Sequence, residues 1–321
     1  MKISRRTFLK GSLTTLFLAG TGLPVYSSSK AKKNLVVIML RGGMDALCAV
    51  PVIGDKNFEK RRKELILDNT IKLNSDFSLH PVLENFHELW KEKQGTIVHA
   101  TNIPYTERSH FDGQNLMESG GKIPYKVKTG WLGRGMMAAG LKKEGLALAL
   151  PMPLLLRGVP QNNNYYPTKG KLPNDKVLAL LNKAYKDRSE ADLIDMLETI
   201  KSRPKETSYA ADDTYSLASE AGTLLKKRDG PRVAVFEVGG FDTHGNQTEE
   251  HPILLRELSL ALWKVQKALE ELGVDDKVAT FTSSDFGRTI GNNGDGTDHA
   301  WSTINLVMSK SSGTTFNGGK F

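Results

Sequence analysis

The sequence contains almost no cysteine: Cys48 is the only one among 321 residues. A single thiol excludes an intramolecular disulfide and any zinc or iron–sulfur site that is built from several cysteines. No run of about 18 uninterrupted apolar residues occurs, so an internal membrane-spanning helix is not expected. Hydrophobic residues make up 39% and charged residues 25% of the chain, which is typical of a globular protein of one large or two modest domains.

The first 29 residues are predicted to be an export signal, separate from the folded domain. Residues 4–10 are basic with two consecutive arginines, residues 11–25 are moderately apolar, and serines follow at 27–29. This pattern resembles a twin-arginine signal peptide. We therefore expect the twin-arginine export machinery as a partner and the periplasm or cell envelope as the destination. An ordinary basic amphipathic helix and an uncleaved anchor are the alternatives.

Little excess positive charge remains once this segment is set aside. The formal net charge of the whole chain is +8, and residues 1–29 hold four basic and no acidic side chains, which leaves +4 for the rest. So small a surplus does not favour a nucleic-acid partner.

Apolar runs alternate with amphipathic segments along the remaining chain. Continuous apolar runs predict buried strands at 34–40, 96–100, 146–150, 232–238, 278–282 and 304–308. Helical spacing predicts helices at 82–93, 130–139 and 248–272, and a mostly helical insertion at about 175–228. Residues 30–321 are thus predicted to form a single α/β domain, in which helices flank both faces of a mostly parallel sheet. The chain stops shortly after the last predicted strand, from which we expect a truncated C-terminus.

Carboxylates, histidines and a serine follow the predicted strands. These residues are Asp45, Ser109, His110, Asp242, His244, Asp285, Asp298 and His299. Because the carboxyl ends of parallel strands share one edge of a sheet, these side chains can converge in one cleft. Imidazole and carboxylate ligands suit zinc, whereas manganese or magnesium prefers more oxygen. A serine hydroxyl that touches such a divalent metal ion becomes a stronger nucleophile.

Several of these residues also have a structural interpretation. Asp45 could cap a helix after the Gly42–Gly43 turn. Adjacent Ser109 and His110 need not face each other, so they do not define a catalytic triad. The two residues around Thr243 could cap the following helix. Residues 294–299 suggest a calcium loop but lack the spacing and the final glutamate of an EF-hand.

Six motifs occur in order along residues 34–301. They are LRGGMDAL at 40–47, RSHF at 108–111, TGWLGR at 129–134, FEVGGFDTHGNQ at 236–247, SDFGRT at 284–289 and GTDHAW at 296–301. Together they resemble the DUF1501 family of exported bacterial proteins of unknown function. That family is similar in turn to the alkaline phosphatase and sulfatase superfamily. The resemblance implies an alkaline-phosphatase-like fold with a metal site at the strand ends.

The resemblance also implies roles for individual residues. Ser109 matches the position of the nucleophile. The implied ligands of a divalent metal ion are Asp45, Asp242, His244, Asp285 and His299, and Asp298 is a further candidate ligand because it lies beside His299 in the same loop. Arg41, Arg108 and Arg288 are candidates for holding the substrate anion, because a guanidinium group makes bidentate contacts with phosphate or sulfate. Surface ion pairing is the alternative for these arginines.

The predicted function is hydrolysis of a small phosphate or sulfate ester by Ser109, activated by the metal ion. Phe286 stands where the superfamily usually has a histidine, so a single metal ion or a site that binds without turnover also fits. The alternative function is a non-catalytic protein of the same fold that binds a metal ion or a cell-envelope polysaccharide. A metal-free serine esterase is a third hypothesis, but the sequence lacks a Gly-x-Ser-x-Gly elbow.

Overall fold

The computed structural model describes residues 33–159, 162–164, 176, 180, 214–226, 230–310 and 315–317, apart from 143, 150, 272, 274, 276 and 277. The predicted signal at 1–29 and most of the predicted helical insertion at 175–228 lie outside these residues. Among the described helices, none is both long and apolar enough to cross a membrane.

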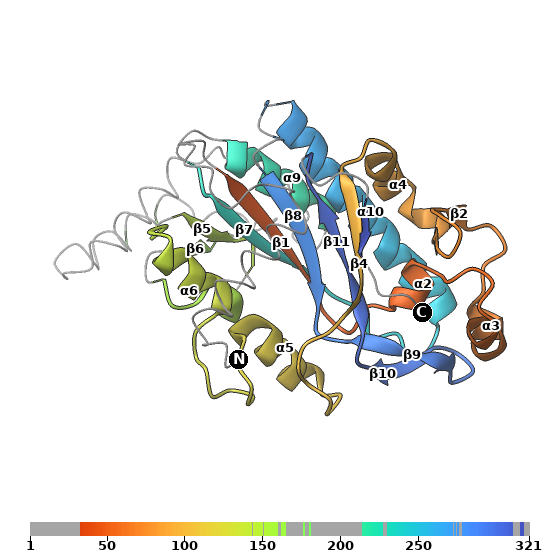
Figure 1. Ribbon diagram of the computed structural model, residues 1–321. Helices are drawn as coiled ribbons and strands as arrows, with labels where there is room; N and C mark the ends of the chain where they lie inside the picture. Colours follow the sequence, from red (N-terminus) through yellow and green to blue (C-terminus); the bar gives the residue numbers. More distant parts are fainter. Residues whose placement is uncertain are drawn as a thin grey trace, which may run out of the picture.

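An eight-stranded sheet forms the centre of the molecule (Figure 1). In spatial order its strands are β12 (Thr315–Asn317), β4 (Gly95–Thr101), β11 (Thr303–Met308), β8 (Val278–Ser284), β1 (Asn34–Leu40), β7 (Val233–Val238), β5 (Gly145–Ala147) and β6 (Asn163–Asn164). Strand β1 pairs in parallel with β7 and β8, and β5 pairs in parallel with β7 and β6. Strand β11 is antiparallel to both β4 and β8. The sheet is therefore mostly parallel, as predicted.

The register of the central strands places their carboxyl ends level with one another. Leu40 at the end of β1 is opposite Val238 of β7 on one side and Ser284 of β8 on the other. The side chains of β1 are buried on both faces, which explains its unbroken apolar sequence. The loops that follow these three strands therefore emerge together at one edge of the sheet.

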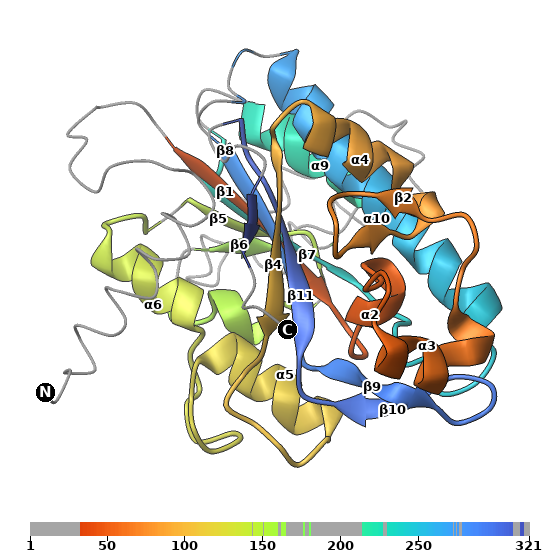
Figure 2. The same ribbon diagram turned by 45° about the vertical axis from the view of Figure 1, so that its right-hand side comes forward.

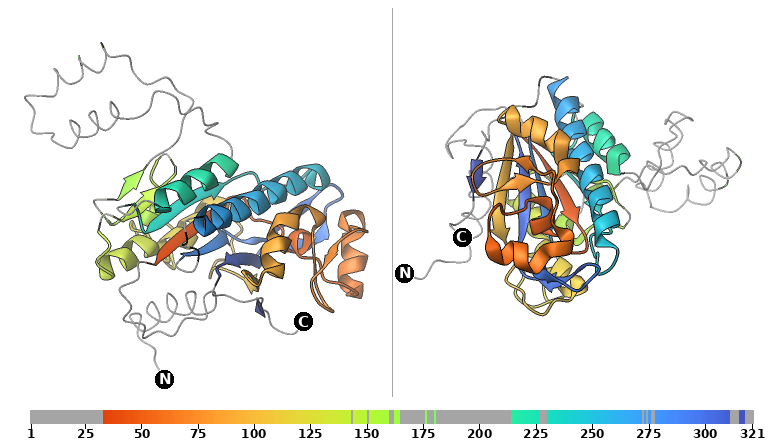
Figure 3. Two further views of the ribbon diagram at one scale, coloured as in Figure 1. Left: turned by 90° about the horizontal axis from the view of Figure 1, so that it is seen from above. Right: turned by 90° about the vertical axis from the view of Figure 1, so that its right-hand side faces the viewer.

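Helices cover both faces of the sheet, which confirms the predicted layers. The helices are α2 (Ala46–Ala49), α3 (Lys56–Arg62), α4 (Glu84–Lys91), α5 (His110–Ser119), α6 (Trp131–Ala138), α9 (Thr214–Lys226) and α10 (Gln247–Glu270), with short 3-10 turns at Lys63–Leu65, Pro81–Leu83 and Leu154–Leu156. Figure 3 shows α9 and α10 side by side against one face. Leu258 and Leu262 of α10 belong there to one buried core cluster with Phe236 of β7. On the other face Met117 of α5 and Leu132 of α6 belong to a second core cluster.

Two short hairpins complete the described structure. One pairs β2 (Ile71–Lys72) with β3 (Ser78–Leu79). The other pairs β9 (Gly287–Asn292) with β10 (Thr297–Ala300), and it places His299 opposite Arg288. Residue 287 must be glycine, because a Cβ there would lie 1.7 Å from the Ser302 carbonyl oxygen. The close approach holds the start of β9 against the segment that joins β10 to β11.

Some elements differ from the sequence predictions. Asparagine, glycine and aspartate at 292–299 are typical of a loop, yet this segment contributes to the β9–β10 hairpin, and β12 follows the strand predicted to be last. Helix α5 is not predicted, because its sequence buries few large apolar side chains, chiefly Leu116 and Met117. Its ends have local causes: Ser109 caps its amino end, and Gly120 ends it with a φ of +63°.

Candidate metal centre

The loops after β1, β7 and β8 meet at the carboxyl ends of these strands, beside the amino end of α5 and the β9–β10 hairpin (Figure 2). The turn after β1 lies directly against the loop after β7. Gly42, with a φ of +106°, permits this approach, because a Cβ there would lie 2.6 Å from the Asp242 backbone nitrogen. Sheet register and glycine geometry together bring distant segments to one place.

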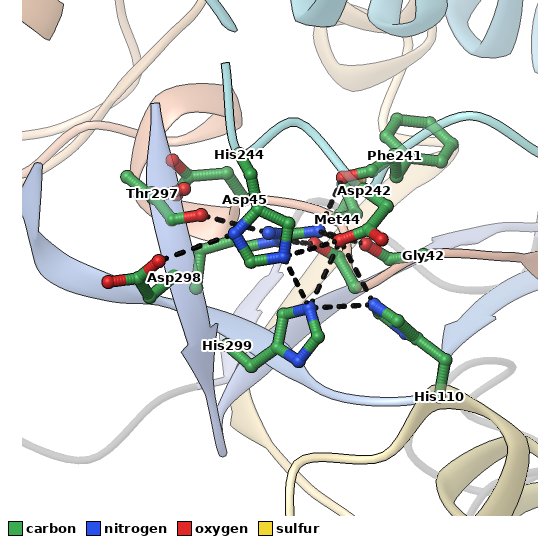
Figure 4. A network of polar contacts seen from close by, with 12 residues as sticks. Gly42, Met44, Asp45, His110, Phe241, Asp242, His244, Thr297, Asp298 and His299 are labelled. Carbon is green, nitrogen blue, oxygen red and sulfur yellow. Dashed lines mark hydrogen bonds and ion pairs between the residues drawn. The ribbon is translucent and has the colours of Figure 1, made fainter. Parts of the chain in front are cut away.

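Three imidazoles and one carboxylate converge at this edge (Figure 4). The Nε2 atoms of His110 and His299 lie 2.9 Å apart, and they lie 3.0 and 3.1 Å from Asp242 Oδ1. The Nε2 atom of His244 lies 2.7 Å from His299 Nε2 and 3.0 Å from Asp242 Oδ1. The predicted convergence of Asp242, His244 and His299 thus matches the geometry, with His110 as a fourth member.

The outer nitrogen of each imidazole contacts an oxygen acceptor. The Nδ1 atoms of His110 and His244 lie 2.6 Å from Asp285 Oδ2 and 3.3 Å from Asp298 Oδ1. The Nδ1 atom of His299 lies 2.7 Å from the Arg108 carbonyl oxygen. A carbonyl or carboxylate oxygen only accepts, so a neutral ring that carries its proton at Nδ1 donates it to this acceptor. In that tautomer the three Nε2 atoms present lone pairs toward the Asp242 oxygen, whereas a ring with a proton at Nε2 donates to Asp242.

Asp285 and Asp298 orient imidazoles in the structure. The Asp285 carboxylate is fully buried, and its Oδ1 accepts hydrogen bonds from the Gly43 N–H at 2.7 Å and the Ser284 hydroxyl at 3.2 Å. Its Oδ2 accepts from His110, and Gln114 Nε2 lies 3.3 Å away. The His110 ring stands between Asp285 and the centre of the cluster. The sequence predicts that Asp285 and Asp298 contact the metal ion directly. In the structure Asp285 contacts His110 instead, and Asp298 contacts His244.

The pKa values at the centre shift in the directions that favour a positive charge there. Burial acts to lower the pKa of His110, but hydrogen bonds and charges from Asp285 and Asp242 prevail and raise it. Burial acts to raise the pKa of Asp242, yet hydrogen bonds from Arg288, His299 and His110 hold it well below its usual range. The carboxylate therefore stays ionised over the ordinary pH range.

Two of the three predicted anion-binding arginines are engaged by the protein itself. The buried guanidinium of Arg288 donates to Asp242 Oδ1 at 2.5 Å and to backbone carbonyls of four residues. Those residues are Gly42, Gly43, Phe241 and Thr297. Arg41 forms ion pairs of 2.7 Å with both Glu118 and Glu237. The Arg108 guanidinium is exposed and forms no ion pair within the part of the chain that the structure describes.

Asp45 lies in a separate, closed network. Its side chain accepts two hydrogen bonds from Arg62 at 2.5 and 3.0 Å, and another from Gln247 Nε2 at 2.6 Å. It also caps α2 by accepting the N–H groups of Leu47 and Cys48. Burial acts to raise the pKa of Asp45, but the charge and hydrogen bonds of Arg62 lower it. The capping interpretation describes its observed contacts, and the predicted contact of Asp45 with a metal ion has no counterpart among them.

Ser109 and Phe286 border the cluster. The Ser109 Oγ accepts the Asp112 N–H at 3.4 Å as the cap of α5, and among the described residues no hydrogen bond links this oxygen to the three imidazoles. The buried Phe286 ring stacks on His110 with a centroid distance of 4.4 Å and lies 4.9 Å from His299. The Phe286 ring therefore gives this side of the site an apolar surface in contact with two of the imidazoles.

A family comparison agrees with the motifs along the chain. The family model described as "Protein of unknown function (DUF1501)" matches residues 32–309. The chain belongs to the DUF1501 family. A search of curated proteins finds no match to the sequence.

Solved structures similar to the DUF1501 chain share little sequence with it. The periplasmic domain of EptC from Escherichia coli, in complex with Zn, has 11% identity and a TM-score of 0.45, over 89% of this chain and 75% of that one. A Vibrio parahaemolyticus protein in the alkaline phosphatase superfamily has 12% identity and a TM-score of 0.44, over 90% of this chain and 63% of that one. Murine ectonucleotide pyrophosphatase/phosphodiesterase 5 in complex with AMP has 13% identity and a TM-score of 0.39, over 80% of this chain. The DUF1501 chain spans only 57% of that structure.

Three imidazole nitrogens and a carboxylate oxygen form a donor set that zinc takes in proteins, and one richer in nitrogen than magnesium or manganese prefers. In the DUF1501 chain one ligand atom each from His110, Asp242 and His299 lies within 4.8 Å of the other two. The ligand set expected from the sequence omits His110, although this residue lies in the RSHF motif beside Ser109. The RSHF motif is the available signal, but a serine at this position is equally typical of a nucleophile and does not single out the imidazole beside it.

Proposed function

We propose that His110, Asp242, His244 and His299 together bind one divalent metal ion, with zinc the best match to the donor set. The observation that carries this proposal is the orientation of the rings. Each Nδ1 faces an oxygen acceptor, so in the tautomer protonated at Nδ1 three Nε2 lone pairs face the ionised Asp242 oxygen at 3.0–3.1 Å. The Nε2 atom of His299 also lies 2.7 and 2.9 Å from the other two Nε2 atoms. Such a set of acceptors repels itself unless a cation or protons lie among them.

The reaction that this centre supports best is the hydrolysis of a phosphate or sulfate ester. When bound, a divalent ion polarises an ester oxygen and lowers the pKa of a hydroxyl or water beside it. Asp285, Asp298 and the Arg108 carbonyl hold the protons at the three Nδ1 atoms, which fixes ring orientation. The Asp242 side chain is 46% exposed, so the centre is open to solvent on that side and a substrate can approach.

Arg108 is our candidate for binding the ester anion. Its guanidinium is exposed and lacks an acidic partner among the described residues, and Ser109 and His110 follow it directly. Its backbone has a φ of +61°, which is uncommon for a residue with a side chain. This conformation accompanies the hydrogen bond from His299 Nδ1 to the Arg108 carbonyl. In this proposal Arg108 orients the His299 ring through its carbonyl oxygen and binds the anion through its guanidinium.

Ser109 is the nucleophile in this proposal. Its oxygen accepts the Asp112 N–H, which leaves the hydroxyl proton free to be transferred. A Ser109→Asn variant retains a good helix cap without the hydroxyl, whereas Ser109→Thr retains both. We expect Ser109→Asn to lose turnover and Ser109→Thr to keep part of it. Full activity of Ser109→Asn would exclude a serine nucleophile and leave hydrolysis by water.

The proposed function is tested by metal analysis of the folded protein together with assays on a panel of aryl phosphates and aryl sulfates. We expect one equivalent of a divalent metal and turnover that a chelator abolishes and the metal restores. His299→Ala should lose both, while His87→Ala, which changes a histidine outside the centre, should lose neither. The absence of bound metal together with no turnover above Ser109→Asn would reject the proposal.

A non-catalytic metal-binding protein is the second candidate, and Phe286 favours it. This buried ring stacks on His110 and His299, and it fills space where a further ligand would extend the centre. Such a protein would bind one equivalent of metal, unfold at a lower temperature after chelation and hydrolyse none of the esters. Turnover lost in Ser109→Asn would exclude this candidate.

We also propose that residues 1–29 direct export by the twin-arginine pathway. The support is the pair Arg5-Arg6 before a moderately apolar stretch. Replacing both arginines by lysine keeps the charge and removes the recognised pair. Cell fractionation should then find the variant in the cytoplasm and the unaltered chain outside it; equal export of the two would contradict the proposal.

A further inference from the structure

The loop between α5 and α6 carries an unusual set of exposed side chains. Residues 121–128 read Gly-Lys-Ile-Pro-Tyr-Lys-Val-Lys, and all three lysines are exposed. None of Lys122, Lys126 and Lys128 forms an ion pair with an acid that the structure describes. In Figures 1 and 2 the connection from α5 to α6 lies at the same end of the sheet as β9 and β10. Positive charge is thus concentrated at the end of the molecule that holds the metal centre.

Large apolar side chains are exposed between these cations. Ile123 is 56% and Tyr125 49% exposed, and Phe111 on the first turn of α5 is 79% exposed. Phe111 directly follows His110, one of the proposed ligands. Exposed apolar residues that gather beside a site commonly mark a binding surface, whereas single scattered ones do not.

The loop is held firmly against α5. The Tyr125 N–H donates to Asn115 Oδ1 at 2.7 Å, and the Tyr125 side chain shares a hydrogen bond with Asp112. Asn115 follows Phe111 by four residues, so both lie on one side of α5. Tyr125 also has a φ of +60°, a left-handed conformation that is unfavourable for a residue with a side chain. The docked contacts therefore maintain a strained backbone that displays an aromatic ring.

We propose that this 121–128 surface, defined as the exposed side chains of residues 121–128 together with Phe111, binds an anionic polysaccharide whose ester reaches the metal centre. The proposal rests on the proposed function, since it names the substrate class of the same centre. Rings such as Phe111 and Tyr125 pack on the apolar faces of sugars. The three lysines lie among them and meet sulfate, phosphate or carboxylate groups along the polymer.

A lipid membrane fits the 121–128 surface less well. The apolar side chains are separated by lysines along the loop, so they do not form the wide continuous apolar face of a membrane-binding helix. The carboxylate of Asp112 lies among them, held by Tyr105 and Tyr125. Insertion of Phe111 and Ile123 into a bilayer would carry this charge toward the acyl chains.

The test uses the purified full chain with dextran sulfate as the probe and neutral dextran as its control, in titrations with and without chelator. We expect dextran sulfate to bind and neutral dextran not to bind. The variant K122A/K126A/K128A should weaken binding about tenfold or more at low salt. The matched variant K56A/K60A/K63A removes the same charge from exposed positions on α3 and the 3-10 turn that follows it, and should change the affinity less than about twofold.

The apolar part of the surface is tested separately with Phe111→Ser. Its loss of affinity should persist at high salt, where the loss caused by the lysine substitutions disappears, because salt screens charge but not ring packing. Equal weakening by the two triple-lysine variants would mean that only total charge matters and would overturn the proposal. Binding to phosphatidylglycerol vesicles but not to dextran sulfate would overturn it in favour of a membrane.

Hydrolysis of a small aryl sulfate and a small aryl phosphate is measured in parallel, so that the two proposals fail separately. Lysine-dependent binding of dextran sulfate without turnover of either ester would reject the hydrolase and keep the 121–128 surface as a binding site. Turnover of a small ester without lysine-dependent binding would keep the hydrolase and reject the polysaccharide.

Discussion

Two aspartates of this protein follow neighbouring parallel strands, and their surroundings are opposite. Asp45, after β1, is fully buried and its carboxylate accepts only from donors: Arg62, Gln247 and backbone N–H groups. Asp242, after β7, is 46% exposed at its side chain and faces three imidazole Nε2 atoms beside the guanidinium of Arg288. Residue type and position at a strand end are shared; the balance of donors and acceptors differs.

That balance separates a structural carboxylate from a functional one. The Asp45–Arg62 pair is neutral and its lone pairs are satisfied, so a cation has nothing to gain there. The Asp242 cluster has surplus lone pairs directed at one another, so a cation is favoured. Histidines follow the same division. Burial lowers the pKa of His251, beside Asp45, to about 4, whereas the neighbouring carboxylates raise the pKa of His110.

The largest expected effect is the loss of stability when Asp45 is replaced. Asp45→Ala leaves the Arg62 guanidinium buried without its carboxylate, which should lower the free energy of unfolding by about 3–5 kcal/mol. Chemical denaturation of the metal-free protein measures this change. The double variant D45A/R62M removes both charges and should recover part of the loss. A change below about 1 kcal/mol in Asp45→Ala would show that the network is not structural.

A substitution in the Asp242 cluster should affect metal binding more than stability. His299→Ala removes one of four proposed ligands, so affinity for Zn²⁺ should fall roughly 100-fold or more, equivalent to about 2.7 kcal/mol. Calorimetric titration measures the affinity, and denaturation of the metal-free protein should show little change. Unaltered Zn²⁺ affinity would contradict the assignment of the centre.

Acid should act on the buried network through His251. Its pKa in the folded protein, about 4, lies below its ordinary value of 6.5, so the unfolded chain binds the proton more readily. Stability is therefore retained above pH 6.5 and lost as the pH falls toward 4, by about 2 kcal/mol at pH 5. Denaturation of the metal-free protein at pH 7.5 and pH 5 measures the loss. Because burial lowers the pKa of His80 to about 4 as well, His251→Gln should reduce this pH dependence without abolishing it.

The smallest expected effect comes from the contact between Asp298 and His244 Nδ1. Asp298→Asn leaves an oxygen near His244 Nδ1 but removes the negative charge that favours a proton there. The contact is 3.3 Å long and the Asp298 side chain is 60% exposed, so Zn²⁺ affinity should fall only about tenfold. The same titration measures it, and a loss as large as that of His299→Ala would instead indicate that Asp298 is itself a ligand.

Sequence alone predicts those elements whose cause is local. The unbroken apolar run of β1 and the apolar stripe of α10 give both elements nearly to the residue. Helix α5 lacks such a stripe, and the serine that caps it is equally typical of a nucleophile. Glycine, aspartate and asparagine around 292–299 indicate a loop, yet the tight approach of Gly287 to Ser302 contributes to fixing a hairpin there.

For the candidate site, the sequence predicts which strand ends converge but not which atoms face one another. Asp242, His244 and His299 were expected together and are found together. The role of Asp45 depends on Arg62, which lies on a short polar helix and gives no sequence signal of being buried. Pairing of that kind is a tertiary property, and no local pattern encodes it.

The buried guanidinium of Arg288 has a consequence for how the centre fills. It ties the turn after β1, the loop after β7 and strand β10 to one permanently charged group, through five hydrogen bonds that no metal ion needs to complete. The backbone around the histidines is therefore assembled in advance. We therefore expect the metal ion to bind a preformed site, at a rate limited by diffusion and by dehydration of the ion. Little folding should be coupled to metal binding.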